Sequence, residues 1–185
     1  LKIGYVSPDF KRHSVQSFLL PTLAHHNHDK FEVFAFAELD KADLITEQYK
    51  SYVDHWIRTE KMNDDKLTQK VRDLGIDILV DVAGHTQNNR LKVFAQKPAP
   101  ISLTWLGFGY TTGLSAIDYF LTDNVMVPQG SEHLFSEKPW RLEKKYSFCC
   151  YQAKPDMGEV NKLPALSKGF ITFGTLTRTV RINDR

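Results

Sequence analysis

Two short segments of the sequence combine a histidine with other residues that can bind a ligand or transfer a proton. Residues 9–14 (DFKRHS) and residues 84–86 (GHT) each follow an apolar stretch. A histidine ring exchanges a proton near neutral pH, and it can also donate a hydrogen bond to a sugar or phosphate oxygen. The first segment therefore offers His13, with Asp9 beside it, as a candidate for proton transfer, and the second offers His85 and Thr86 as candidates for binding.

A third candidate segment is the glycine-rich loop of residues 106–113, which follows an apolar stretch ending at Trp105. Glycine has no side chain, so Gly107 would let the backbone approach a ligand closely, with Leu106 beside it. Gly107 would equally serve a tight turn.

The other candidates also have structural alternatives. His13 would be an ordinary exposed turn residue, and Asp9 would cap its own turn. Thr86 would cap the helix that follows, and Arg90 would pair with a local carboxylate. The loop position of His85 favours a polar contact in a cleft over a place in the core.

Strands alternating with helices must position these loops. Apolar, β-prone stretches predict strands, and residues 76–82 have the nearly continuous apolar character of a central parallel strand. Alternation with helical patterns predicts a parallel, doubly wound α/β sheet, in which ligands bind beyond the carboxyl ends of the strands. The expected strands are 1–7, 31–37, 55–58, 76–82, 101–105 and 119–121, and the expected helices are 15–23 capped by Ser14, 41–52, and one capped by Asp64 or Asp65 that runs through Leu74.

Composition narrows the classes of function. A net charge of +2 from 24 basic and 22 acidic residues leaves no basic face for a nucleic acid. The sequence has no apolar run of membrane-spanning length and no signal peptide, so we expect a cytoplasmic protein without a membrane partner. Cys149 and Cys150 are adjacent and therefore suit neither a disulfide nor a metal pair. The histidine-rich residues 25–28 (HHNH) more plausibly form a helix end than a metal site.

Two enzyme classes lack their sequence signatures. No G-x-S-x-G elbow of a serine hydrolase is present, and no G-x-G-x-x-G of a dinucleotide dehydrogenase follows the first strand.

Many short motifs in register resemble the catalytic region of the O-linked N-acetylglucosaminyltransferases and their SPINDLY-like relatives. Residues 4–13 (GYVSPDFKRH) match the start of that region position by position. The other matches are Gly84-His85-Thr86, Arg90, Pro98-Ala99-Pro100, Trp105-Leu106-Gly107, Thr111-Thr112-Gly113 and Asp118-Tyr119.

The resemblance implies a GT-B architecture, with two Rossmann-like lobes facing across a cleft. Residues 1–153 would be the N-terminal Rossmann-like catalytic lobe, residues 154–168 a linker, and residues 169–185 the start of a C-terminal nucleotide-sugar-binding lobe. The chain would then be a piece of a longer protein, with residues 169–173 as the first strand of the second lobe. Alone, it should transfer no sugar.

The resemblance also implies the chemistry. UDP-N-acetylglucosamine would donate its sugar, with inversion, to Ser and Thr hydroxyls of proteins, with His13 and Asp9 at the reaction centre. His85, Thr86, Leu106 and Gly107 would contact the donor. Positive side chains and helix N-termini would stabilise the leaving diphosphate, so no metal or other cofactor is expected.

Two departures from the family pattern keep alternatives open. Residues 108–110 (FGY) replace a Tyr-Pro-Gly, and Arg181 stands where a diphosphate-binding lysine is usual, which changes the hydrogen-bonding geometry. The alternatives are another donor, such as GDP-fucose or UDP-glucose, and a non-catalytic binding module.

Overall fold

The computed structural model describes residues 1–143 and 158–175. The chain divides into two compact units, Leu1–Gln152 and Ala153–Arg185. Arg181, Cys149, Cys150 and the predicted boundary at residue 153 lie outside the described residues.

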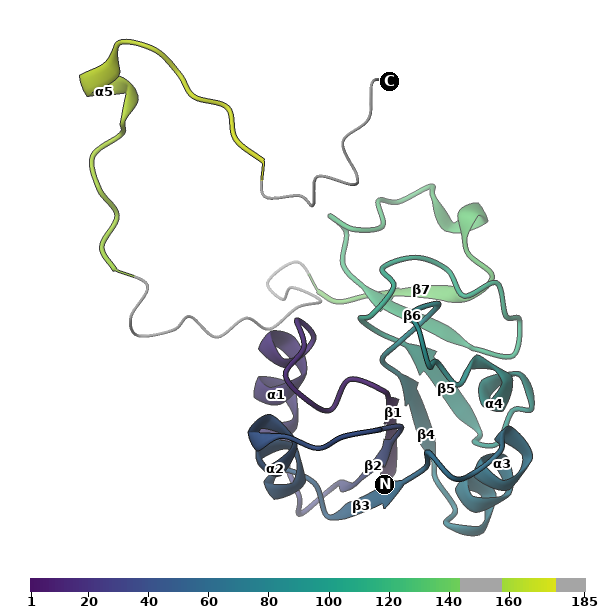
Figure 1. Cartoon of the computed structure of the whole chain (residues 1–185). Helices are drawn as coiled ribbons and strands as arrows, with labels where there is room; N and C mark the ends of the chain where they lie inside the picture. Colours follow the sequence, from purple (N-terminus) through teal and green to yellow (C-terminus); the bar gives the residue numbers. More distant parts are fainter. Residues whose placement is uncertain (144–157, 176–185) are drawn as a thin grey trace. The chain divides into compact units, whose positions relative to one another are not determined.

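Seven strands in the first unit form one sheet, in which every pairing is parallel (Figure 1). The strand order is β3-β2-β1-β4-β5-β6-β7. This arrangement confirms the predicted parallel α/β fold. The strands are β1 Lys2–Ser7, β2 Glu32–Ala37, β3 His55–Arg58, β4 Ile78–Asp81, β5 Ile101–Thr104, β6 Tyr119–Thr122 and β7 Lys138–Arg141.

Helices cover both faces of this sheet. The first pair, α1 and α2, lies on one face, and α3 and α4 lie on the other (Figure 1). Each pair packs on its own cluster of buried side chains, as in a doubly wound sheet. The helices are α1 Gln16–Ala24, α2 Leu44–Ser51, α3 Asp64–Asp73 and α4 Leu91–Ala95, followed by the 3₁₀ helix η1 Glu132–Leu134.

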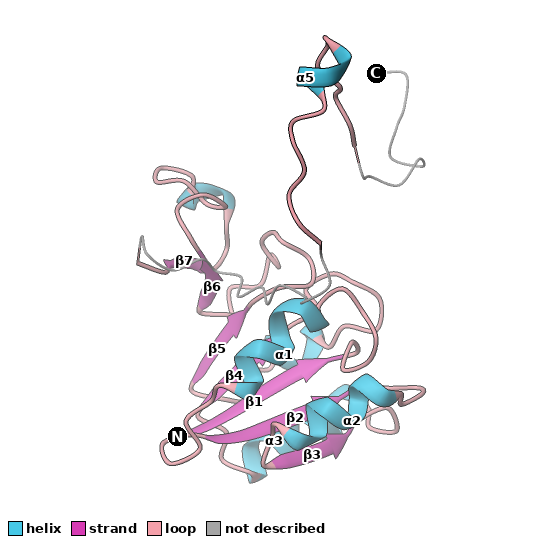
Figure 2. Ribbon diagram, turned by 90° about the vertical axis from the view of Figure 1, so that its left-hand side faces the viewer, coloured by secondary structure: helices cyan, strands magenta, loops and turns pink. Residues whose placement is uncertain are grey.

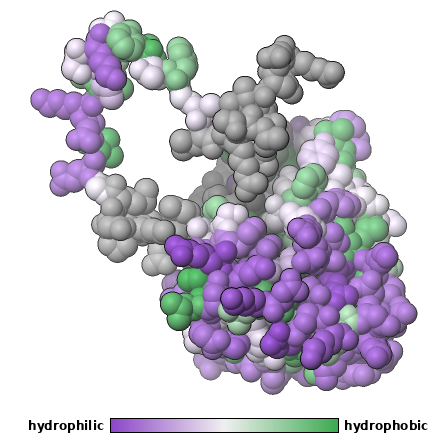
Figure 3. Space-filling view, viewed as in Figure 1, coloured by the Kyte–Doolittle hydropathy of each residue, from purple (hydrophilic) through white to green (hydrophobic). Residues whose placement is uncertain are grey.

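The two apolar clusters arise because central strands alternate their side chains between the faces. Tyr5 belongs to the cluster beneath α1 and α2, whereas the next residue, Val6, belongs to the cluster beneath α3 and α4. Because both faces are covered, β1 is almost entirely buried, which explains why its central residues, 3–6 (IGYV), include no charged side chain. The outer surface seen in Figure 3 is mainly hydrophilic over this unit.

Two predicted helix caps are wrong by one or two residues. α1 has Val15, not Ser14, at its N-cap, without a side-chain cap. α3 is capped by Asn63, whose side chain accepts from the Lys66 N–H at 2.9 Å. The charged residues Asp64 and Asp65, predicted as caps, instead occupy the first turn, where carboxylates also suit the helix dipole.

α2 is shorter than the predicted helix 41–52 because a capping box fixes its start. The Asp43 carboxylate accepts from the Thr46 N–H at 3.0 Å, and the Thr46 hydroxyl lies 3.0 Å from the Asp43 N–H, which donates to it. The helix therefore begins at Leu44.

Among residues 158–175, the described part of the second unit, there is one short helix, α5 Ala165–Lys168, within the segment predicted to be a linker. Gly169 ends this helix in the left-handed conformation, at φ 73°. The strand predicted for residues 169–173 is wrong, since these residues have no strand structure. A strand exists through pairing with another, and the described residues of this unit provide no second strand.

The order of strands reverses between β1 and β4, which lie side by side at the centre of the sheet (Figure 2). Loops leaving the carboxyl ends of neighbouring strands at such a point diverge to opposite faces and leave a crevice. The β1–α1 and β4–α4 loops, which carry Asp9, His13 and His85, are these two loops. None of the described helices is long and apolar enough to cross a membrane.

Candidate functional site

The β1–α1 and β4–α4 loops start next to each other. The Val82 N–H donates to the Val6 carbonyl at 3.1 Å, so the strand pairing continues to the point where the loops begin. Asp9 follows two residues after the end of β1, and Gly84 follows three residues after the end of β4. The sheet therefore delivers both predicted segments to one edge.

Asp9 and His13 form a loose pair within the first loop. Asp9 Oδ2 lies 3.6 Å from His13 Nδ1, and the Val15 N–H donates to the same nitrogen at 3.4 Å. Both distances are longer than strong hydrogen bonds, so the ring is held weakly. The His13 side chain is 40% exposed, whereas that of Asp9 is 13% exposed. Burial raises the pKa of Asp9, while His13 and Lys11 act in the opposite direction.

The turn of residues 84–86 is built on Asp81, the last residue of β4. Its carboxylate accepts from the Ala83 N–H at 3.1 Å, the Gly84 N–H at 2.9 Å and the Thr104 hydroxyl at 2.7 Å. Asp81 is 1% exposed, and complete burial raises the pKa of its carboxyl despite these three donors. The Asp81 carboxylate thus accepts the hydrogen bonds of the Ala83 and Gly84 N–H groups, which lie beyond the end of β4 and have no neighbouring strand to pair with.

The carbonyl of Ala83 joins the second loop to the loop that follows β5. It accepts from the Thr86 N–H at 3.2 Å, the Thr86 hydroxyl at 2.9 Å and the Phe108 N–H at 3.2 Å. The Thr86 side chain therefore closes its own turn and does not cap α4, whose N-cap is Arg90 without a side-chain cap.

The close approach predicted for Gly107 is made to the protein itself. A Cβ atom at Gly107 would stand 2.4 Å from the Ala83 carbonyl oxygen and 2.6 Å from its Cα. Leu106 and Gly107 both have positive φ, at 64° and 70°, so the chain reverses tightly here. The turn alternative is therefore confirmed for Gly107, and the contact of Leu106 and Gly107 with a donor stays a prediction.

His85 is exposed, and its ring contacts the β5–β6 loop. Its Nε2 lies 2.9 Å from the Thr112 carbonyl oxygen, and its ring meets the Phe108 ring edge-on at 5.7 Å between centroids. Because a carbonyl only accepts, Nε2 is the nitrogen that carries the proton. The predicted loop position of His85, outside the core, is confirmed.

Glu137, just before β7, binds the β5–β6 loop through its carboxylate. It accepts from the Thr112 N–H at 2.7 Å, from the Thr112 hydroxyl, and from the Thr111 hydroxyl at 2.7 Å. Glu137 is 2% exposed; burial acts to raise its pKa, but the bonds from Thr112 and Thr111 outweigh it and leave the pKa lowered. The role of Glu137 could not be predicted, because nothing in the local sequence distinguishes it from a surface glutamate.

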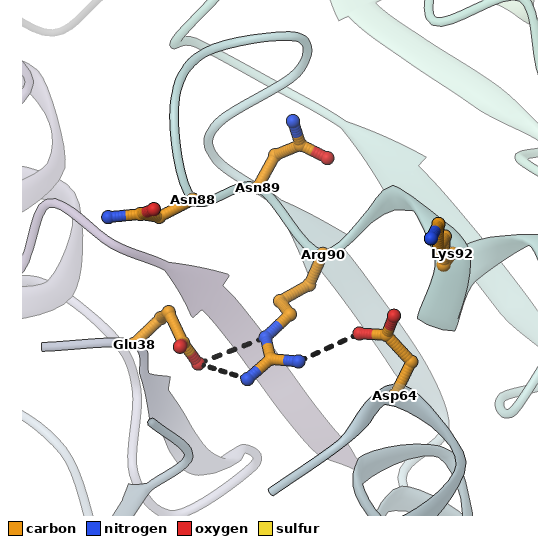
Figure 4. A pocket seen from close by; sticks show the side chains of 6 residues that line it. All are labelled: Glu38, Asp64, Asn88, Asn89, Arg90 and Lys92. Carbon is orange, nitrogen blue, oxygen red and sulfur yellow. Dashed lines mark hydrogen bonds and ion pairs between the residues drawn. The ribbon is translucent and has the colours of Figure 1, made fainter. Parts of the chain in front are cut away.

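Arg90 makes an ionic clamp that ties three loops together (Figure 4). Its guanidinium donates to Glu38 at 2.6 and 2.9 Å and to Asp64 at 2.8 Å, and it also bonds the Thr59 and Met62 carbonyls. The clamp lies on the wall of an open pocket of about 300 Å³. Pairing with local carboxylates, the structural alternative for Arg90, is confirmed.

Replacing Arg90 with alanine is expected to lower the free energy of unfolding by roughly 3 kcal/mol, because two partly buried carboxylates and two carbonyls lose their donor. Arg90→Lys should recover only part of this loss, since one ammonium group cannot reproduce the planar fork. Urea unfolding followed by circular dichroism measures both variants. An Arg90→Ala variant within 0.5 kcal/mol of the wild type, the usual range of a surface substitution, would contradict the clamp.

No group of three or more possible metal ligands occurs among residues 1–143 and 158–175. The histidine-rich segment is instead paired locally. His28 contacts Asp54 at 3.0 Å, His26 contacts the Tyr5 hydroxyl at 2.8 Å, and His25 contacts the Pro21 carbonyl at 2.7 Å. These contacts agree with the helix-end interpretation.

Comparisons with known proteins agree with this arrangement. The family model described as glycosyl transferase family 41 matches residues 1–152. Over 189 residues the chain is 38% identical to a probable UDP-N-acetylglucosamine–peptide N-acetylglucosaminyltransferase, SPINDLY, from Solanum lycopersicum, covering 100% of this chain and 20% of that protein. It is 33% identical over 170 residues to a probable enzyme of the same description, SEC, from Arabidopsis thaliana, covering 90% of this chain and 17% of that protein.

A solved structure shares both the fold and the sequence pattern. A mutant O-GlcNAc transferase from Thermobaculum terrenum superposes with a TM-score of 0.80 at 36% identity, over 84% of this chain and 30% of that one. The chain thus spans about a fifth of the curated relatives' length.

Proposed function

The chain belongs to glycosyl transferase family 41, and from this membership we propose that the whole protein transfers N-acetylglucosamine from UDP-N-acetylglucosamine to Ser or Thr hydroxyls of proteins. The observation that supports this most strongly is 38% identity along the entire chain to a relative whose name states that donor and a peptide acceptor. The fold supports it further, because His13 and His85 lie in loops that follow the carboxyl ends of β1 and β4, the edge at which α/β sheets bind ligands.

In the proposed reaction, an acceptor hydroxyl oxygen attacks the anomeric carbon of the sugar with inversion. The bond between that carbon and the diphosphate breaks, its electron pair leaves with UDP, and the hydroxyl proton passes to His13. The ring suits this role because its side chain is 40% exposed and so can reach a substrate hydroxyl. Asp9 would stabilise the imidazolium that forms, since its carboxylate is 3.6 Å away.

The remaining site assignments belong to the same proposal. His85, Thr86, Leu106 and Gly107 would form the wall of the donor site, with Thr86 and Gly107 acting through the backbone that they shape. Arg181 would meet the diphosphate. Residues 1–153 would act as the N-terminal lobe of a two-lobe enzyme in the cytoplasm, so residues 1–185 alone should transfer no sugar and bind nucleotide weakly.

A panel of nucleotide sugars tests the proposed donor. The whole protein is incubated with a Ser/Thr-rich peptide and UDP-N-acetylglucosamine, UDP-glucose or GDP-fucose, each with and without a metal chelator. We expect transfer from UDP-N-acetylglucosamine that the chelator does not reduce. Preference for GDP-fucose or UDP-glucose would identify the alternative donor, strict dependence on a divalent metal would refute the metal-free reaction, and turnover of none of the three would favour a binding module.

A further inference from the structure

Hydrogen bonds through Thr112 connect the buried carboxylate of Glu137 to the exposed ring of His85 in two steps. Glu137 accepts from the Thr112 N–H and hydroxyl, the Thr112 carbonyl accepts from His85 Nε2, and the ring lies edge-on against Phe108. The residues come from the β6–β7, β5–β6 and β4–α4 loops. A buried carboxylate and a surface histidine thus bond to the same residue, Thr112.

The contact at Nε2 decides what the other ring nitrogen can do. With its proton on Nε2, a neutral imidazole has a lone pair on Nδ1, which is then an acceptor only. Among the described residues, no group donates a hydrogen bond to His85 Nδ1, and the side chain is exposed at the carboxyl edge of the sheet. The ring therefore presents an oriented acceptor, open to solvent or to a ligand, beside the candidate donor loop.

We infer that His85 Nδ1 accepts a hydrogen bond from a hydroxyl or amide N–H of the sugar donor, and that Glu137 is a positioning residue that holds His85 in this form through Thr112. The inference rests on the proposed function, because it takes a nucleotide sugar as the ligand. Sugar hydroxyl and acetamido N–H groups are the donors that such an acceptor recognises, whereas phosphate oxygens, which only accept, are not.

Two substitutions of His85 separate its two nitrogens. Asparagine places its amide oxygen near the position of Nδ1 but cannot reach Thr112, whereas glutamine places its amide nitrogen near the position of Nε2 and leaves Nδ1 without a counterpart. In the whole protein, we expect the KM for UDP-N-acetylglucosamine to rise about tenfold in His85→Gln, the loss of one hydrogen bond. It should rise less in His85→Asn. Equal, wild-type KM values in both variants, or a larger rise in His85→Asn, would overturn the assignment of Nδ1.

Nitrogen NMR of the histidine-labelled whole protein reads the ring directly. The His85 signals should show a protonated Nε2 and an unprotonated Nδ1, and the Nδ1 signal should move toward the hydrogen-bonded range as UDP-N-acetylglucosamine saturates the protein. In Glu137→Ala this single form should be lost, and Glu137→Gln should restore it, since its amide oxygen still accepts from Thr112.

The possible negative results distinguish a wrong inference from a wrong proposed function. If the protein binds and turns over the donor while Nδ1 stays unchanged, the inference is wrong and the proposed function stands. If Glu137→Ala folds and retains the Nε2-protonated form, Glu137 is not the positioning residue. If the wild type neither binds nor turns over a nucleotide sugar, the proposed function fails and the inference fails with it.

Discussion

Replacing Gly107 with alanine is expected to lower the free energy of unfolding by roughly 3 kcal/mol or more, because the new methyl group meets backbone and the residue has positive φ. The Cβ atom would lie 2.4 Å from the Ala83 carbonyl oxygen, and no flexible side chain is there to move aside. The loop must therefore separate from the 84–86 turn. A displacement of about 1 Å at a catalytic site costs on the order of 100-fold in rate, so transfer by the whole protein should fall by at least that factor.

Gly113 provides the matched control for this variant. It has a similar φ of 74°, but a Cβ atom there would meet nothing within 4 Å. Gly113→Ala should cost only about 1 kcal/mol, the strain of the left-handed conformation. Chemical denaturation gives both stabilities, and a Gly107→Ala variant no less stable than Gly113→Ala would show that the two loops do not pack as described.

His13→Ala is expected to lower kcat of the whole protein by roughly 100- to 10,000-fold, the range for losing a general base. Stability should change little, because the side chain is exposed and makes only long contacts. Initial rates with UDP-N-acetylglucosamine and a peptide acceptor give kcat, and thermal unfolding gives stability. Asp9→Asn should reduce kcat less, since it removes the carboxylate but leaves the ring.

A second surface histidine serves as the control for His13. His25 lies just after the last residue of α1, at the opposite end of that helix from His13, and its ring contacts the Pro21 carbonyl at 2.7 Å. His25→Ala should retain wild-type kcat. Normal turnover by His13→Ala would remove its catalytic assignment, and a large fall in its melting temperature would favour a structural role.

The centre of the fold could be predicted because burial on both faces leaves a clear pattern. β1 and β2 are apolar almost throughout, and each predicted strand among residues 1–122 is present within one or two residues. β7 was missed because Lys138, Pro139 and Arg141 give it a polar appearance. That composition is compatible with the edge of a sheet, where a proline can lie without removing a hydrogen bond between strands.

Local chemistry alone could not choose among adjacent capping residues. Any of three adjacent residues, Asn63, Asp64 and Asp65, has a side chain that can cap a helix. The cap is Asn63, because its amide oxygen accepts from the Lys66 N–H. The same limit applies to the site. The positions of its loops can be predicted from the pattern of strands. The side chains that fix the loop conformations bond to residues distant in the sequence, as Glu137 does with Thr112 and Arg90 with Glu38, and such pairs cannot be predicted from local sequence.

We propose above all that this chain carries the reaction centre of a protein N-acetylglucosaminyltransferase. Mass spectrometry of an acceptor protein, after incubation with the whole protein and UDP-N-acetylglucosamine, tests it most directly when the wild type and His13→Ala are compared. We predict that the wild type adds N-acetylhexosamine to Ser or Thr residues and that His13→Ala adds almost none under the same conditions. An acceptor left unmodified by the wild type, or modified equally by both, would contradict the claim.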